Sequence, residues 1–113
     1  MNDTEFLAAY AKRAAPKCGW PTLEGYVRHI QVSSAALHLI GQNSVTDLPS
    51  VIAACLCREW LREWLAERGG YSLTHPAGRP VCVTIVGADG EEGYCWGDTE
   101  GEALLAAMEA PHA

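Results

Sequence analysis

Apolar and polar positions along the chain first repeat with a helical period and, after a glycine pair, with a strand period. The longest predicted helix covers residues 47–70, with Pro49 in its first turn and Gly69-Gly70 as its stop signal. At roughly 100° per residue, its apolar side chains share one arc of about 140°, a face broad enough to pack on a sheet. These side chains are Ala53, Leu56, Cys57, Trp60, Leu61 and Trp64. The opposite side carries Arg58, Glu59, Arg62 and Glu63.

Three short strands are predicted after the glycine pair. Residues 71–74 (YSLT) alternate apolar with polar side chains, as in a strand with one buried face. Residues 81–86 (VCVTIV) are apolar on both faces apart from Thr84, which is typical of a central strand that is covered on each side. Asp89-Gly90 is a strong hairpin signal, and residues 93–97 (GYCWG) form the third strand. The pattern therefore predicts an antiparallel sheet.

The chain before the long helix contains one clear helix. Residues 4–15 have amphipathic spacing, and either Asp3 or Thr4 is placed to cap the N-terminus of this helix. Pro16 is expected to end the helix, because proline lacks the backbone N–H that a helix interior needs.

The remaining elements have an irregular pattern over residues 25–42 and a clear pattern near the C-terminus. Residues 25–32 are predicted to be a strand, because β-favouring residues dominate them. Residues 33–42 fit either a second strand or a short helix, and the strand is favoured. Near the C-terminus, Thr99 and Glu102 match a capping box in which each satisfies the other's backbone donor. A last helix over residues 103–110 should follow.

The predicted order of elements, αβ(β)αβββα, indicates an α+β fold. An antiparallel sheet of three to five strands with helices packed on it, an α/β/α-type sandwich, buries the central strand on both faces. The length of 113 residues predicts a single domain, residues 1–113.

The net negative charge lies entirely in the C-terminal part of the chain. The net charge is −6, and the residues up to Arg68 contain equal numbers of acids and bases. Such a surface disfavours nucleic-acid binding, since phosphates attract lysine and arginine. Three interpretations stay open, namely a solvated surface, a face for a basic protein partner, and a nucleic-acid-mimicking inhibitor of a DNA-binding protein. The candidate acidic partner face consists of Asp89, Glu91, Glu92, Asp98, Glu100 and Glu102.

Cysteine usage and hydropathy predict a cytoplasmic protein without a membrane segment. The five cysteines are an odd number without a regular framework, which favours reduced thiols. The first residues, MNDTEF, lack the features of an export signal. The longest apolar run, residues 51–57, is far shorter than the roughly 20 residues that span a bilayer.

The search for catalytic chemistry predicts a protein that is not an enzyme and binds no metal or cofactor. The chain contains no nucleophile elbow, P-loop, zinc-protease or dinucleotide-binding motif. Cys55 and Cys57 point apart on the helix and cannot share one ion. A small thiol or zinc enzyme that uses Cys82, Cys95 and His75 is the remaining catalytic alternative.

Five features carry a resemblance to a known family. They are the loop and helix VTDLPSVIAACLCREWLREWL, the Gly-Tyr strand start that follows it, the hairpin end GYCWGDT, the last helix EGEALLAAMEA, and the first helix with its Cys18-Gly19-Trp20 loop. Together they resemble the phage α/β/α sandwich domain, a family of small phage and prophage proteins. The resemblance implies a compact accessory protein with no catalytic residues to transfer. We therefore expect a phage-like protein that acts by protein–protein contact, with an unknown partner or as a homodimer.

Overall fold

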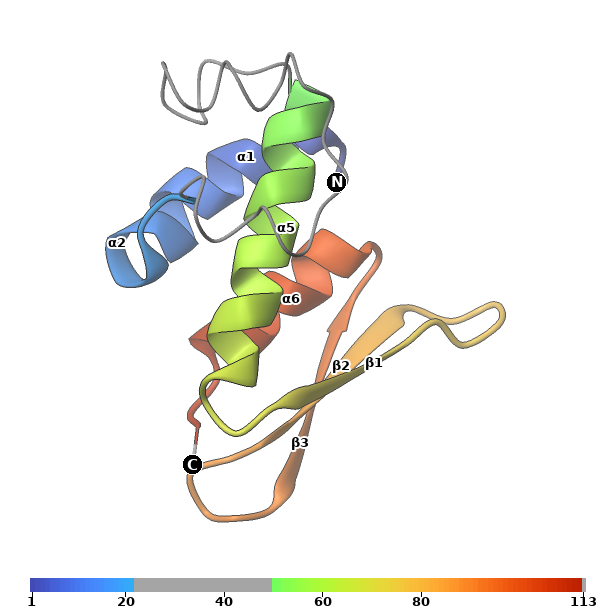
Figure 1. Ribbon diagram of the computed structural model, residues 1–113. Coiled ribbons are helices and arrows are strands. Elements are labelled where there is room, and N and C mark those ends of the chain that lie inside the picture. Colours follow the sequence, from blue (N-terminus) through green and yellow to red (C-terminus); the bar gives the residue numbers. More distant parts are fainter. Residues whose placement is uncertain (22–49, 113) are drawn as a thin grey trace. The chain divides into compact units, whose positions relative to one another are not determined.

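A computed structural model describes residues 1–21 and 50–112 of the chain (Figure 1). It contains helices and a three-stranded antiparallel sheet, which confirms the predicted α+β class. The predicted strand at 25–32, the segment 33–42 and the beginning of the long helix lie outside the described residues. The long helix itself, α5, is described over Ser50–Ala66.

The chain divides into two compact units, and the boundary falls inside α5. One unit is Asn2–Trp60, and the other is Leu61–Ala113 together with Met1. The expectation of a single domain over residues 1–113 stays a prediction.

The N-terminal helix begins one residue earlier than expected. It consists of α1 (Asp3–Ala9), a π-helical segment (Tyr10–Ala14) and α2 (Ala15–Cys18). Asn2 caps α1, so the prediction of Asp3 or Thr4 was wrong. The Asn2 side chain accepts a hydrogen bond from the Glu5 backbone N–H at 2.8 Å, and the Glu5 carboxylate accepts one from the Asn2 N–H at 3.1 Å. Asn2, Asp3 and Thr4 can all cap a helix, but only Asn2 lies three residues before Glu5, the spacing that a capping box requires. This spacing explains why Asn2 is the N-cap.

Pro16 does not end this helix, which is a second correction. The π-helical segment shifts the hydrogen-bond ladder by one residue, and Pro16 then falls in the first turn of α2. A first-turn position needs no intrahelical N–H donor, so the proline fits without a lost hydrogen bond. The helix stops at Gly19, whose φ of 71° is a conformation that favours glycine.

Aromatic side chains fix the end of α2 in this unit. The buried Tyr10 hydroxyl donates a hydrogen bond to the Gly19 carbonyl, and the indole N–H of Trp60 donates one to the Cys18 carbonyl at 2.8 Å. Trp20 packs against Tyr10 with a ring-centroid distance of 5.1 Å. Two of the carbonyls left over at the helix end are therefore satisfied by side chains that also fill the core.

Cys57 lies in the same core, and its burial should make the protein less stable at alkaline pH. Its side chain is completely buried, and this burial raises the pKa of the thiol from 9.0 to about 12 against a smaller opposing effect of Arg58. Between these values the folded state keeps a proton that the unfolded chain loses. The free energy of unfolding should therefore fall as pH rises from about 9, by up to roughly 1.4 kcal/mol per pH unit.

Chemical denaturation between about pH 8 and pH 10 tests this dependence. In the variant Cys57→Ala, the fall of stability with pH should be shallower. Cys55→Ala, at a half-buried position two residues away, is the matched control and should keep the wild-type slope. Equal slopes in the two variants would contradict the assignment to Cys57.

The sheet of the other unit follows the predicted strands closely. It consists of β1 (Tyr71–Thr74), β2 (Val81–Val86) and β3 (Glu92–Gly97), in the order β1-β2-β3 with antiparallel neighbours. The strand β3 begins one residue before the predicted bounds. The final helix, α6 (Glu100–Glu109), begins directly after β3 and packs on β2 and β3 (Figure 1).

The capping box at the start of α6 is only half formed. Thr99 accepts a hydrogen bond from the Glu102 N–H at 3.3 Å, as predicted. The Glu102 carboxylate, however, accepts from the Asp98 N–H at 3.2 Å instead of the Thr99 N–H.

Helix α6 covers one face of the sheet, which we call the inner face. Buried residues of α6 and of the last turns of α5 form the core of this unit with the inward side chains of β2. On α5 the predicted apolar face is buried except for Trp60, which is half-buried. The core residues of the unit are Leu61, Trp64, Leu65, Val81, Val83, Ile85, Ala103, Leu104, Leu105, Ala107 and Met108.

Candidate functional site

The face of the sheet opposite the inner face carries the most exposed aromatic side chains of the described chain. We call it the outer face, and its residues are Ser72, Thr74, Cys82, Thr84, Val86, Glu92, Tyr94 and Trp96. Tyr94 is 61% exposed and Trp96 is 50% exposed. They are neighbours on one face of β3, since successive side chains on a strand alternate between faces.

The residues between these aromatics are small. Gly93, Cys95 and Gly97 alternate with Tyr94 and Trp96 and face inward, toward α6. At Gly97 even a Cβ atom would collide with the backbone of α6, whereas the aromatics on the outer face meet solvent. The two large side chains of β3 therefore lie on the outer face, which no helix of this unit covers.

The outer edge of β3 exposes backbone groups of the same residues. The Gly87 N–H donates to the Glu91 carbonyl at 2.8 Å, which fixes the hydrogen-bonding phase of the hairpin. In an antiparallel pair, residues alternate between bonding to the partner strand and pointing away from it. The backbone groups of Glu92, Tyr94 and Trp96 therefore point away from β2, and no strand pairs with this edge within the described part of the chain.

Three of the six predicted acidic residues lie together at the β2–β3 turn. Asp89, Glu91 and Glu92 are all exposed. Asp89 accepts a hydrogen bond from the Glu91 N–H at 3.0 Å, and Glu92 accepts one from the Tyr94 hydroxyl at 3.0 Å. The hydrogen bond to Glu92 raises the pKa of Tyr94, because the carboxylate accepts the phenol proton. We call these three residues the hairpin carboxylates.

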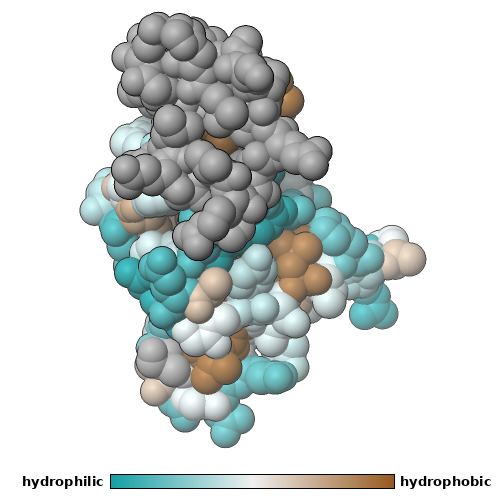
Figure 2. All heavy atoms as spheres, in the orientation of Figure 1, coloured by the Kyte–Doolittle hydropathy of each residue, from teal (hydrophilic) through white to brown (hydrophobic). Residues whose placement is uncertain are grey.

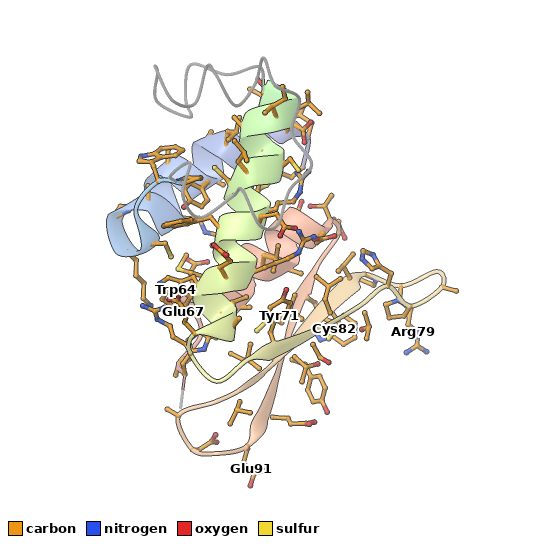
Figure 3. All side chains as sticks on the ribbon, in the orientation of Figure 1. Trp64, Glu67, Tyr71, Arg79, Cys82 and Glu91 are labelled. Atoms are coloured by element: carbon orange, nitrogen blue, oxygen red, sulfur yellow. The ribbon has the colours of Figure 1, made fainter. Side chains whose placement is uncertain are left out.

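No basic side chain forms an ion pair with the hairpin carboxylates in the described part of the chain. Arg79 is the one arginine or lysine after residue 68, and it lies on the β1–β2 loop. Figure 3 shows Arg79 and Glu91 at opposite ends of the sheet. Among the residues described, no cationic group therefore lies within ion-pair distance of the hairpin carboxylates.

The other three predicted acidic residues lie beyond the opposite end of β3. Asp98 is exposed, but Glu100 and Glu102 are half-buried. Glu100 forms an ion pair with Arg62 and lies 3.7 Å from the His75 ring nitrogen. The Glu102 carboxylate lies 2.9 Å from the Met1 ammonium group. The structure thus separates the predicted acidic residues into two groups. All members of the hairpin group are exposed and without an ion pair among the described residues, whereas two of the three members of the other group are half-buried and ion-paired.

A pocket of about 440 Å³ opens beside the hairpin carboxylates. Apolar groups of the inner face and of the chain after α6 line it, together with all three hairpin carboxylates and Tyr94. Figure 1 shows the residues that follow α6 beside the β2–β3 turn. The apolar lining residues are Ile85, Gly87, Ala88, Gly93, Cys95, Ala110 and Pro111.

The strand register separates the residues of the thiol or zinc alternative. Cys82 lies opposite Trp96 and faces outward, whereas Cys95 lies opposite Val83 and faces inward. Two side chains on opposite faces of a sheet cannot bind the same ion. Among residues 1–21 and 50–112, no three histidine, cysteine or carboxylate side chains are grouped to hold a metal.

Comparisons with known proteins identify no relative of this chain. No family model matches it, and no curated protein or solved structure matches it at a significant level. The resemblance to phage α/β/α sandwich proteins therefore stays a prediction. Within the described residues, none of the helices has the length and apolar character that crossing a bilayer requires.

Proposed function

We propose that this chain is a small, non-enzymatic, cytoplasmic protein of phage-like type that binds a partner protein on the outer face of its sheet. The observation that carries the proposal is the exposure of Tyr94 and Trp96 side by side on β3. Tyrosine and tryptophan combine a large apolar area with a polar group, and they are the residues that most often anchor protein interfaces. Neither side chain is buried by the described residues of the unit that carries it.

The surroundings of the pair support an interface rather than scattered exposure. Val86 is 38% exposed on the same face, and Thr84 of β2 lies directly opposite Tyr94. On the side drawn in Figure 2, hydrophobic residues form small separate patches among hydrophilic ones. Isolated exposed apolar residues are ordinary, whereas adjacent aromatic side chains on a rigid strand form a preorganised contact.

The charge of this unit favours a different protein over a second copy of this chain as the partner. Residues 69–113 carry seven acidic residues and one arginine. Two copies joined through this region would bring strongly negative surfaces together, which like-charge repulsion opposes. A partner with a basic surface gains from the same field.

Substitution of both aromatics tests the proposal. The double variant Tyr94→Thr/Trp96→Thr keeps β-favouring residues in the strand but removes the contact area. The partner is first captured from cell extract with the wild-type chain and purified. The double variant should bind this purified partner about a hundredfold more weakly than the wild type does, because aromatic anchors contribute most of the binding energy of an interface. Val51→Thr is the control, since Val51 on α5 is also 61% exposed.

The outcomes are distinguished by measurements on the purified proteins. Circular dichroism should show the same folded content in both variants. Light scattering during gel filtration detects a dimer, and an aromatic-dependent dimer would show that the partner is a second copy. Equal affinity of the double variant and the wild type would contradict a binding role of this face.

A further inference from the structure

We infer that the partner segment is an extended, lysine- or arginine-containing polypeptide that pairs with the outer edge of β3 as a fourth strand and places one cationic side chain in the pocket beside the hairpin carboxylates. This inference rests on the proposed function and specifies the chemistry of its partner. Three features of the same unit carry it, namely the strand edge, the charge and the pocket.

The edge of β3 supplies the backbone hydrogen bonds for strand addition. Glu92, Tyr94 and Trp96 each direct an N–H and a carbonyl away from β2, as the phase of the hairpin requires. An extended peptide aligned with these groups continues the ladder of the sheet. The side chains of the same three residues are exposed on the outer face, so an added strand is in contact with both aromatics.

Natural proteins usually protect a strand edge with lysine, proline or a bulge. The β3 edge contains no lysine, arginine or proline, and its register with β2 is unbroken from Val86–Glu92 to Val81–Gly97. Its charged residue is Glu92, at the end next to the hairpin. Among the described residues the edge is therefore protected only by negative charge, which repels acidic segments and another copy of this edge but attracts basic ones.

The pocket fits a long cationic side chain rather than a small ion. Its lining is mostly apolar and suits the aliphatic stem of lysine or arginine, and it also includes Asp89, Glu91 and Glu92, whose carboxylates can meet the charged end. Ala110 and Pro111, directly after α6, complete the lining. The C-terminal end of a helix carries partial negative charge, which adds to the attraction for a cation.

The position of the pocket is consistent with strand addition. Gly93 and Cys95 of the inner face line it together with Glu92 and Tyr94 of the outer face, so it lies along β3 itself. A side chain of an added strand that faces the α6 side is therefore directed toward the pocket, and its neighbours in the peptide face the aromatics. One segment satisfies all three features without a change in the fold.

Calorimetric titration with designed peptides tests the inference on the full chain. The probe is an octapeptide of alternating lysine and valine, blocked at both ends. Two peptides are controls, namely the same peptide with glutamate in place of lysine, and the lysine peptide with alternate backbone nitrogens methylated. Only the unmodified lysine peptide should bind, because the first control reverses the charge and the second removes the ladder hydrogen bonds.

Two double variants with equal net charge identify the site. Glu91→Gln/Glu92→Gln should weaken binding of the lysine peptide about tenfold, since two charge-assisted contacts are lost. Glu67→Gln/Asp98→Asn changes two exposed carboxylates outside the pocket and should weaken binding less than about twofold.

Several results would overturn the inference. Absence of binding, equal binding of the methylated peptide, or equal loss in the two double variants would each show that no basic strand pairs with β3 at this pocket. If the lysine peptide fails while partner binding still depends on Tyr94 and Trp96, the proposed function stands and only the basic-strand inference fails. If neither is found, both fail.

Discussion

Replacement of Gly97 by alanine should destabilise the protein by about 3 kcal/mol or more, since overpacking against a rigid backbone is among the costliest core changes. A Cβ atom at this position would lie 2.4 Å from the Ala103 backbone nitrogen and 2.6 Å from the Glu102 Cβ. Both distances are far below van der Waals contact. The colliding atoms belong to the first turn of α6, which cannot rotate out of the way as a side chain could.

Gly93→Ala is the matched control for this collision. Gly93 also faces inward on β3, and its added Cβ would meet the Ile85 side chain at 3.6 Å, an ordinary contact distance. Both substitutions change strand propensity and chain entropy in the same way. The difference between the two unfolding free energies, measured in urea, therefore isolates the collision with α6. Values for the two variants that agree within about 0.5 kcal/mol would contradict the close packing of strand on helix.

The C-terminal part of the fold was predictable because its signals are local. The alternation of residues 71–74, the Asp89-Gly90 turn and the Thr99 cap each lie at the position where the structure uses them. The bounds of β3 differ from the prediction by one residue. Here the local pattern and the packing of the sheet on α6 require the same conformation.

The N-terminal helix was predicted less well because its decisive features involve more than one residue. Asn2, Asp3 and Thr4 are all good N-cap residues, and only the spacing from Asn2 to Glu5 selects among them. Pro16 is an ordinary helix terminator when read alone. The preceding π-helical segment changes the position of Pro16 in the hydrogen-bond ladder. No residue type predicts a π-helical segment from the sequence.

The candidate site was predictable in its charge but not in its geometry. Counting charges located the acidic region, yet it could not show that Glu100 is neutralised by Arg62 from a distant part of the chain. The aromatic pair left a clearer signal. In GYCWG the smallest and largest side chains alternate, which indicates one face packed closely on a helix and one face open. The pocket depends on the approach of the chain end to the hairpin, which no local pattern encodes.

Leu104→Ala should lower the free energy of unfolding by about 3 kcal/mol, because it removes a completely buried side chain and leaves a cavity. Val86→Ala is the control, since Val86 is 38% exposed on the outer face of the same unit. It should cost less than about 1 kcal/mol. Urea unfolding followed by circular dichroism gives both values.

The same variant tests the prediction of a single domain over residues 1–113. Helix α5 runs without a break from Ser50 to Ala66 and so contributes to both compact units. Loss of one unit would leave half of this helix without its core, and we therefore expect both units to unfold in one transition. Hydrogen exchange of buried amides near Tyr10 and near Leu105 reports on the two units separately. In Leu104→Ala, protection should fall equally at both places, whereas a loss confined to the Leu105 region would show two independently folding units.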